Sequence, residues 1–122
     1  QEDIRGDIGS LNEVTKVIEK FKPDYIFHLA AQALVNESYI NPIKTVSVNA
    51  LGTANILESA RKIDKKVILV MITSDKAYDN VEWNWGYRET DRLGGKDPYS
   101  ASKASSDHLV YSFFKTIGLK TS

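Results

Sequence analysis

The sequence predicts an α/β fold in which helices pack on a parallel, doubly wound sheet. Helical and strand-like patterns alternate along the 122 residues, in the order helix, strand, helix, strand, helix. Residues 67–72 are an unbroken run of large apolar side chains, as expected of a strand covered on both faces. Parallel strands joined by helices bind ligands beyond their carboxyl ends. We therefore expect three layers, α/β/α, around one sheet, with any site at that edge.

The first half of the chain provides a helix, a strand and a long second helix. Ser10 is predicted as an N-cap, with Glu13 three residues later, for a helix that ends near residue 22. Residues 25–29 are apolar and aromatic, which is typical of a buried parallel strand. A continuous helix is expected over 42–63. Its buried side is predicted to contain Val46, Ala50, Ala54, Ile56, Leu57 and Ala60.

The second half provides the central strand, a long loop and a final helix. Residues 67–72 form the central strand, and residues 77–97, rich in Asp, Asn, Gly and Trp, show no period. Loops of that length in compact domains usually carry function. Asp97 and Pro98 then indicate an N-cap and a first helical position, for a helix that runs to about Ile117 and ends at Gly118.

Composition and charge exclude several classes of partner. The chain is 42% hydrophobic and 26% charged, which suits one soluble domain, and 16 Lys and Arg balance 16 Asp and Glu. Zero net charge points to neither nucleic acid nor an anionic membrane. No apolar run approaches the roughly 20 residues of a membrane span, and the polar start is not a signal peptide. The absence of Cys excludes thiolate metal ligands and is compatible with a cytoplasmic location; no metal site is predicted.

Two segments bring proton-handling groups to the same edge of the predicted sheet. Ser74, Asp75 and Lys76 follow the central strand, and Tyr99 and Lys103 lie four residues apart on one face of the final helix. A tyrosine phenol has a reference pKa of about 10, so a nearby cation is needed to favour its phenolate. A lysine one turn away supplies that cation, and a serine hydroxyl can hold the same substrate oxygen. This chemistry is alcohol oxidation, which needs a hydride acceptor.

These residues resemble the extended short-chain dehydrogenase/reductases, and within them the nucleotide-sugar 4,6-dehydratases. The resemblance covers essentially the whole chain and rests on the segments Gly6–Ile8, His28–Gln32, Val48–Thr53, Thr73–Lys76 and Tyr99–Lys103. The Trp-containing segment 74–100 is most similar to members that act on CDP-glucose. Lys76 stands where other members usually carry a glutamate, which makes it a subgroup marker. The resemblance implies a Rossmann-type domain that binds NAD and a nucleotide sugar.

The resemblance also implies the reaction, the conversion of CDP-D-glucose to CDP-4-keto-6-deoxy-D-glucose. Tyr99, Ser74 and Lys103, the oxidising set, would oxidise C4 by hydride transfer to NAD. Asp75 would protonate the departing C6 hydroxyl and Lys76 would take the C5 proton; these two residues are called the eliminating pair. Hydride then returns to C6. An amine accepts a proton near neutral pH only when its surroundings lower its pKa, so the role of Lys76 depends on nearby cations and burial.

The resemblance implies cofactor contacts at several places along the chain. Asp7 and Ile8 resemble the family's adenine contacts, Asn49 is an inward-facing polar helix residue, and Thr73 borders the nicotinamide. Tyr99 and Lys103 would also touch the cofactor. The dinucleotide would run along the strand end formed by Leu29, Ala30, Ala31 and Gln32. For the two alanines, simple packing between strand and helix is an equal alternative.

Other conspicuous side chains have plainer interpretations. His28 and His108 are expected to be hydrogen-bonded core histidines rather than catalytic ones. Trp83, Trp85 and Tyr87 favour packing within the loop over a role in the sugar-nucleotide pocket.

The chain is expected to be an internal fragment. The glycine-rich turn that receives the pyrophosphate at a helix N-terminus is absent from it, and the family carries that turn upstream and most of its substrate domain downstream. Alone, the chain is expected to bind NAD poorly and to be inactive; the full-length enzyme is expected to form a homodimer or larger homo-oligomer through its long helices. The alternatives are another nucleotide-sugar dehydratase or epimerase of the family, or a non-catalytic dinucleotide-binding module.

Overall fold

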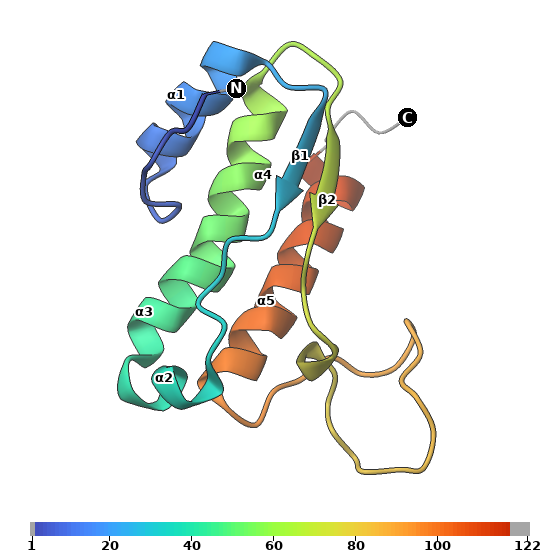
Figure 1. Ribbon diagram of the computed structural model, residues 1–122. Helices are drawn as coiled ribbons and strands as arrows, with labels where there is room; N and C mark the ends of the chain where they lie inside the picture. The colour runs from blue at the N-terminus through green and yellow to red at the C-terminus, as the bar shows by residue number, and fades with distance from the viewer. Residues whose placement is uncertain (1, 118–122) are drawn as a thin grey trace.

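The computed structural model describes residues 2–117 and has a two-stranded parallel sheet backed by helices (Figure 1). Strand β1 (Tyr25–His28) pairs with β2 (Ile68–Met71) so that Tyr25 lies opposite Ile68 and His28 opposite Met71. The predicted alternation of helices and strands is present, with one short helix, α2, that the sequence did not predict. The helices are α1 (Leu11–Phe21), α2 (Val35–Ile40), α3 (Pro42–Val46), α4 (Gly52–Lys62) and α5 (Pro98–Ser112).

Helix α1 begins and ends at identifiable caps. The side chain of Ser10 accepts a hydrogen bond from the backbone N–H of Glu13 at 3.4 Å, as the capping pattern predicts. The Glu13 carboxylate does not return to Ser10; it accepts from the backbone N–H of Asp7 at 2.9 Å and so holds the preceding turn against the helix. At the other end Lys22 adopts a left-handed conformation with φ 43° and donates its N–H to the carbonyl of Ile18.

The predicted helix over 42–63 is interrupted. A π-helical turn, Ser47–Leu51, separates α3 from α4. Ala50, Leu57 and Ala60 are buried as predicted, whereas the expectation for Val46 is wrong, because its side chain is 43% exposed. One extra residue in a turn rotates the following helix by about 100°. If a regular helical period is extended across the π turn, it therefore assigns the residues before the turn to the wrong face of the helix.

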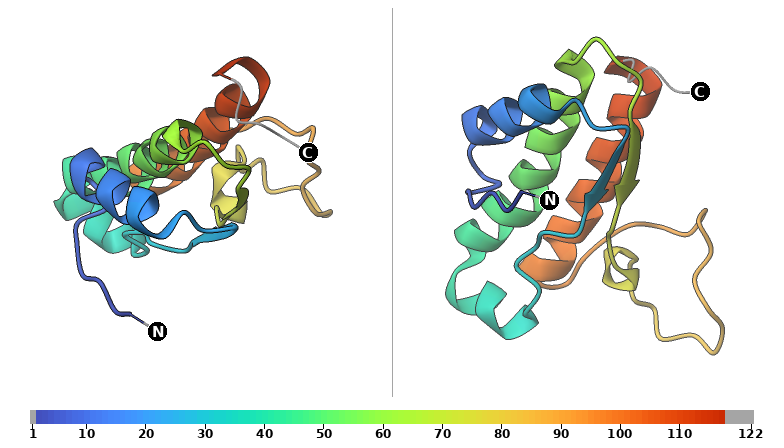
Figure 2. Two further views of the ribbon diagram at one scale, coloured as in Figure 1. Left: turned by 90° about the horizontal axis from the view of Figure 1, so that it is seen from above. Right: turned by 45° about the horizontal axis from the view of Figure 1, so that its top comes forward.

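The helices cover one face of the sheet and leave the other open (Figure 2). On the covered face, Leu57 and Ala60 of α4 form the centre of the core with Ile26, Leu69 and Met71 of the strands. On the open face, Tyr25 and Phe27 are 57% and 63% exposed, and Ile68 and Ile72 are also exposed. Within the described residues, the expectation that both faces of the strands are covered is therefore wrong. The chain contains two layers of the Rossmann-like α/β arrangement.

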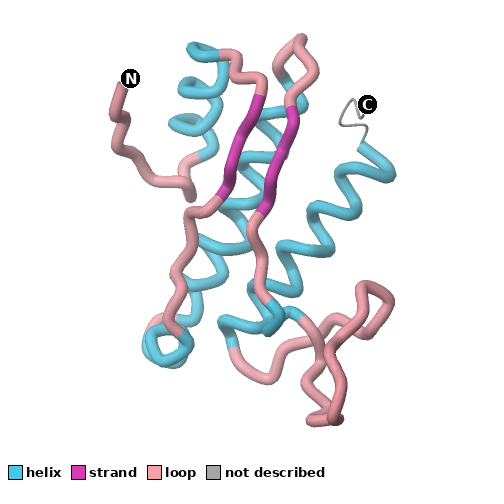
Figure 3. Tube along the Cα trace, turned by 45° about the vertical axis from the view of Figure 1, so that its right-hand side comes forward, coloured by secondary structure: helices cyan, strands magenta, loops and turns pink. Residues whose placement is uncertain are grey.

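Both strands point toward the long loop and the first turn of α5 (Figure 3). Beyond β2 the chain forms a short 3-10 helix, Asp75–Ala77, and then the loop, which lacks regular structure apart from a bridge between Tyr78 and Leu93. Gly95 brings this loop back against α5 so closely that an added Cβ would overlap the backbone of Ser100 and Ala101. Only glycine fits there.

Helix α5 begins where the sequence predicts. The Asp97 side chain accepts from the backbone N–H of Ser100 at 2.9 Å, and Pro98 occupies the first turn. The helix continues into a π-helical turn over Phe113–Ile117, which agrees with the predicted extent. The predicted end at Gly118 lies outside the described residues.

Candidate active site

The candidate catalytic residues come from two elements that meet beyond the carboxyl end of β2. Ser74 is the N-cap of the 3-10 helix that contains Asp75 and Lys76, and this helix packs against α5, which carries Tyr99 and Lys103. Figure 1 shows this short helix beside the first turns of α5. The sequence therefore predicted correctly that these segments converge.

The oxidising set is largely buried. Tyr99 and Lys103 are 8% and 6% exposed, and Ser74 is half-buried. The Lys103 ammonium donates to the carbonyl of Ile72 at 3.5 Å, which fastens α5 to the end of β2. Burial lowers the pKa of Lys103, and the carboxylate of Asp107 opposes that shift. Lys103 is thus a buried amine whose charge depends on its neighbours.

The eliminating pair is exposed and organised by Ser74. The Ser74 hydroxyl accepts from the Lys76 backbone N–H at 3.2 Å and donates to the Asp75 carboxylate at 3.1 Å. Asp75 and Lys76 border a cavity of about 340 Å³, whose other walls come from the loop and the first turn of α5, including Tyr87 and Ser100. A carboxyl group and an amine thus share one solvent-accessible cavity, an arrangement suited to proton transfer, whereas Tyr99 and Lys103 are not among the residues that line it.

Asn49 fastens the segment that follows β1. Its side-chain oxygen accepts from the backbone N–H of Gln32 at 2.8 Å, and its amide donates to the Gln32 carbonyl at 3.0 Å and to the Ser102 hydroxyl at 2.9 Å. The Gln32 side chain is itself bound to Thr45 and Leu34. Both Asn49 and Gln32 therefore have structural roles, which the sequence predicted for neither.

The strand end next to Asn49 is open. Leu29 and Ala30 are exposed and Ala31 is half-buried. Small side chains at the carboxyl end of a parallel strand allow the backbone to approach a ligand closely, so this segment fits a dinucleotide.

A polar network links α4 and α5 behind the candidate site. Thr53 and Ser106 both donate to the carbonyl of Asn49, at 2.7 and 3.0 Å, and the Ser102 hydroxyl donates to the carbonyl of Tyr99. The sequence analysis missed these hydroxyls. Their signal was available, because small polar residues four apart, 49 and 53 and again 102 and 106, lie on one face of each helix.

The histidines behave differently from each other. His28 is buried, and its Nε2 lies 3.1 Å from the Thr53 hydroxyl, which confirms the core interpretation. Burial, and then the charge of Lys103, lower the pKa of His28. The same interpretation is wrong for His108, which is exposed. His108 lies on the side of α5 that faces the loop, where it lines a second cavity of about 630 Å³.

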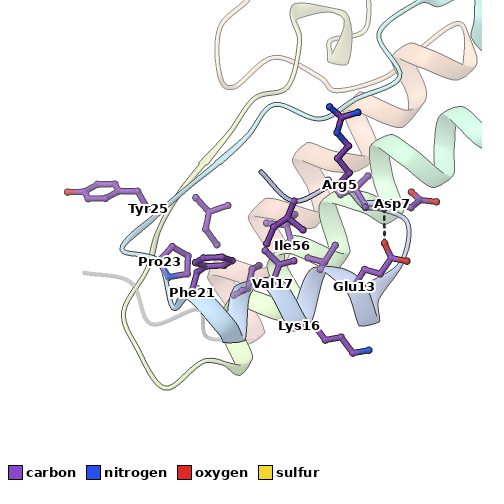
Figure 4. Close-up of a pocket in the computed structure, with 15 residues that line it drawn as sticks. Arg5, Asp7, Glu13, Lys16, Val17, Phe21, Pro23, Tyr25 and Ile56 are labelled. Carbon is purple, nitrogen blue, oxygen red and sulfur yellow. Dashed lines mark hydrogen bonds between the residues drawn. The ribbon is translucent and has the colours of Figure 1, made fainter. Parts of the chain in front are cut away.

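Asp7 and Ile8 lie at a third cavity, of about 710 Å³, between α1 and the free edge of β1 (Figure 4). Ile8 packs against Gly52, and its carbonyl accepts from the Asn55 amide at 2.9 Å. The Asp7 carboxylate accepts from the backbone N–H of Gly9 at 2.8 Å. The cavity walls are mostly apolar, with Asp7 at the rim, and Tyr99 is not among the residues that line the cavity. An apolar wall beside a carboxylate is compatible with the predicted adenine contacts.

The aromatic residues of the loop pack on one another, as expected. The rings of Trp83 and Trp85 stack at 5.1 Å and those of Tyr78 and Tyr87 at 5.2 Å. The Tyr87 hydroxyl donates to the Asn80 side chain at 2.8 Å. Because Tyr87 also lines the 340 Å³ cavity, the stack forms a structural link between the loop and the eliminating pair.

Asp107, one turn after Lys103 on α5, is a half-buried carboxylate that the sequence analysis did not single out. Burial raises the pKa of Asp107, and Thr73, His108 and Lys103 each oppose that shift. Asp107 therefore belongs to the electrostatic surroundings of the candidate site.

Comparisons with known proteins identify the family. A family model described as GDP-mannose 4,6 dehydratase matches residues 2–122, so the chain belongs to this family of NAD-dependent nucleotide-sugar dehydratases and epimerases. Among curated relatives, the CDP-glucose 4,6-dehydratase of Salmonella typhimurium is 48% identical over 110 residues, which is 90% of this chain and 30% of that protein. The dTDP-glucose 4,6-dehydratase of the same organism is 38% identical, over 94% of this chain and 37% of its own length.

Solved structures agree on the fold. A double mutant of dTDP-glucose 4,6-dehydratase from Streptomyces venezuelae, with NAD and DAU bound, matches 95% of this chain and 35% of that one, with a TM-score of 0.85 and 26% identity. A UDP-glucose 4-epimerase from Thermus thermophilus, in complex with NAD, matches 95% of this chain and 37% of that one, with a TM-score of 0.83 and 32% identity. The chain thus spans 30–37% of the length of these relatives. No helix among residues 2–117 is long and apolar enough to cross a membrane.

Proposed function

We propose that this chain is the part of a nucleotide-sugar 4,6-dehydratase that carries its catalytic residues, and that the substrate is CDP-D-glucose. The observation that carries the proposal is the meeting of the oxidising set with the eliminating pair beyond the carboxyl end of β2. The similarity to a CDP-glucose 4,6-dehydratase supports the choice of nucleotide. The product would be CDP-4-keto-6-deoxy-D-glucose.

The residues of this chain would divide the proton transfers among them. Tyr99 takes the proton of the C4 hydroxyl, Ser74 holds the same oxygen, and the Lys103 ammonium favours the phenolate. The C4 ketone makes the C5 proton acidic. Lys76 removes that proton, and Asp75 protonates the C6 hydroxyl, which leaves as water. Lys76 would then give its proton back to C5 as hydride is delivered to C6, which completes the 4-keto-6-deoxy product. A bound NAD would supply the hydride acceptor for C4 and the hydride donor for C6.

The chain also offers surfaces that suit NAD. We infer that the dinucleotide runs from the 710 Å³ cavity beside Asp7 and Ile8, past the open strand end at residues 29–32, to Thr73. Asn49 supports this path through Gln32. The free edge of β1 and the uncovered sheet face support the further proposal that the chain is an internal fragment, with poor NAD affinity and no turnover alone. Tight stoichiometric NAD binding by the isolated chain would contradict the fragment proposal.

The role of Lys76 is tested by Lys76→Ala in a full-length enzyme that contains this segment. We expect formation of the 4-keto-6-deoxy product to fall by about 10²–10⁴-fold, the typical contribution of a general base, while NAD stays bound. Lys44→Ala is the charge-matched control, because Lys44 is exposed on α3, away from the cavity. Full dehydration by Lys76→Ala would dismiss Lys76 as an essential base.

An epimerase is the second candidate function. The CDP-paratose 2-epimerase of Salmonella typhi is 31% identical over 98% of this chain and 40% of its own length, which keeps this alternative open. Asp75 and Lys76 favour the dehydratase, because epimerisation needs no eliminating pair, and retention of the oxidising set argues against a non-catalytic module. Incubation with CDP-glucose and other nucleotide sugars separates the three, since only a dehydratase forms a 4-keto-6-deoxy product.

Association of the full-length enzyme is also a proposal. Tyr111 and Phe114 remain exposed along α5 and the turn after it, at 65% and 37%, and Leu51 is 49% exposed before α4. These apolar side chains on the long helices support a homodimer or larger homo-oligomer. Sedimentation of the full-length protein would test this directly.

A further inference from the structure

The loop that follows the 3-10 helix leaves the body of the molecule and doubles back to α5 (Figure 1). Backbone hydrogen bonds join its two limbs at the base, where the Asp79 N–H donates to the Arg92 carbonyl at 2.9 Å. The Gly94 N–H likewise donates to the Ala77 carbonyl at 2.8 Å. Farther along the loop, side chains join the limbs, and Asn80, directly after Asp79, takes part in two of these contacts.

Asn80 binds residues of both limbs. Its side-chain oxygen accepts hydrogen bonds from the Tyr87 hydroxyl at 2.8 Å and from the backbone N–H of Glu82 at 3.0 Å. Its backbone carbonyl accepts from the Lys96 ammonium at 2.9 Å. Lys96 immediately precedes Asp97, the N-cap of α5. Asn80 therefore connects the outgoing limb of the loop to the returning limb and to the start of the helix.

Tyr87 extends this connection to the segment that carries the eliminating pair. Its ring lies nearly parallel to that of Tyr78, with centroids 5.2 Å apart and planes 5° apart, and its hydroxyl accepts from the Val81 N–H at 3.2 Å. Tyr78 directly follows the 3-10 helix that contains Asp75 and Lys76. The three residues that meet at these contacts are called the loop clasp: Asn80, Tyr87 and Lys96.

All three residues of the loop clasp line the 340 Å³ cavity of the eliminating pair. Lys96 brings to this cavity a cation that Asn80 holds in place. Asp97, which also lines it, is occupied as a cap, because its carboxylate oxygens accept from the N–H and the hydroxyl of Ser100 at 2.9 and 2.6 Å. Water that enters a site weakens the electrostatic effects within it. The surroundings of the pair therefore depend on whether the loop clasp is closed.

We propose that Asn80 is a positioning residue for the elimination: through Tyr87 and Lys96 it holds the loop in place around the cavity in which the eliminating pair acts. In the proposed step Lys76 takes the C5 proton, and the electrons of that C–H bond form the C5–C6 double bond. The C6 hydroxyl leaves as water with a proton from Asp75. Asn80 acts through its neighbours and takes part in neither proton transfer. The inference rests on the proposed function, because only a dehydratase uses this pair.

The oxidation at C4 does not share this dependence. Tyr99 and Lys103 are buried and are not among the residues that line the cavity. Opening of the loop clasp should therefore slow the elimination and leave the oxidation nearly unchanged. General damage to the domain would instead slow both steps.

Single-turnover kinetics test this separation in a full-length enzyme that contains this segment, loaded with NAD and mixed with CDP-glucose. The absorbance of reduced nicotinamide measures the oxidation at C4, and the 4-keto-6-deoxy product measures dehydration. For Asn80→Ala we expect oxidation within about twofold of wild type and dehydration slowed by about tenfold, because two donors lose their acceptor. Asn80→Asp is expected to restore dehydration, since a carboxylate oxygen accepts the same two hydrogen bonds.

Asn84→Ala is the matched control, because Asn84 is exposed in the same loop and does not line the cavity. It is expected to leave both rates unchanged. The proposal is overturned if Asn80→Ala dehydrates at the wild-type rate, if it slows both steps equally, or if Asn84→Ala slows dehydration as much. Failure of Asn80→Asp to restore dehydration would overturn it as well.

Limited proteolysis by trypsin provides a readout that requires no turnover. Arg88 and Arg92 are exposed in the loop, and cleavage after them follows the population of the open loop when opening is fast relative to cleavage. We expect cleavage at these two positions to be about tenfold faster in Asn80→Ala than in wild type, and unchanged in Asn84→Ala. Equal cleavage of Asn80→Ala and wild type would reject the role of Asn80. If wild type forms no 4-keto-6-deoxy product from any nucleotide sugar, the proposed function fails, and proteolysis still decides whether Asn80 holds the loop.

Discussion

Replacement of Asn49 by alanine tests how the segment after β1 is held. The Asn49 side chain makes hydrogen bonds of 2.8 and 3.0 Å to the backbone of Gln32 and of 2.9 Å to the Ser102 hydroxyl. Asn49 and Ser102 are 2% and 1% exposed. Asn49→Ala removes all three bonds at once and leaves a small void between the strand end and α5.

The expected loss of stability follows from these partners. A buried polar group left without its partner costs about 1–3 kcal/mol. Ser102 is fully buried and carries the full cost, although it keeps its bond to the Tyr99 carbonyl. Gln32 is half-buried, so water recovers part of the loss there. We therefore expect Asn49→Ala to lower the free energy of unfolding by about 2–4 kcal/mol.

Urea denaturation followed by circular dichroism measures this change. Asn36→Ala is the control, because Asn36 is exposed on α2, and it is expected to change stability by less than about 0.5 kcal/mol. A loss below about 1 kcal/mol for Asn49→Ala would refute the reasoning, since it would mean that the three bonds are replaced without cost. In a full-length enzyme, the variant should also bind NAD more weakly, because residues 29–32 would no longer be fixed.

Three further changes probe the core, the loop and a buried histidine. Leu57→Ala should cost about 2–5 kcal/mol in urea denaturation, because Leu57 is fully buried, whereas Leu51→Ala, at a 49% exposed position, should cost much less. Gly95→Ala should destabilise by about 1–3 kcal/mol or displace the loop, because its Cβ would overlap α5, whereas Gly86→Ala meets nothing within 4 Å and serves as its control. The pKa of His28 is lowered in the folded state, so as the pH falls through about 6.5 the unfolded chain binds a proton on His28 before the folded chain does. The stability that depends on neutral His28 is therefore complete above this pH and declines below it. His28→Gln should therefore lose less stability than wild type between about pH 7.5 and 5.5; an equal loss would contradict this assignment.

Local signals in the sequence were sufficient for most of the fold. The caps at Ser10 and Asp97 and the apolar run over 67–72 predicted elements that the structure contains. The π turn at Ser47–Leu51 could not be predicted, because a regular helical period contains no sign of one inserted residue. The six residues of α2 are too few to show a period at all. Exposure of one sheet face depends on what packs there, which periodicity within one strand does not record.

The candidate site was predictable where chemistry lies in the side-chain type and its spacing. Tyr99 and Lys103 share a helix face because of their separation by four residues, and the strand end brings Ser74 to them. Asp107 was missed although the same spacing continues to it from Lys103, because a carboxylate eight residues from the tyrosine carries no sign that it is half-buried. Burial depends on tertiary packing, and spacing along one helix does not contain it.

The structure separates two electrostatic environments that the sequence presents as one cluster. Tyr99 and Lys103 are buried, and burial lowers the pKa of Lys103, whereas Asp75 and Lys76 lie in an open cavity where solvent screens their charges. An elimination that requires Lys76 as a base therefore needs that cavity to be closed by substrate or by further chain, because screening by water weakens the influence of neighbouring cations on the amine. The oxidation step has no such requirement, since its lysine is already enclosed. Hydride transfer should consequently tolerate changes in the loop over 78–97 better than the elimination does. Substitutions in the aromatic stack that links this loop to the eliminating pair should therefore slow the elimination more than they slow hydride transfer.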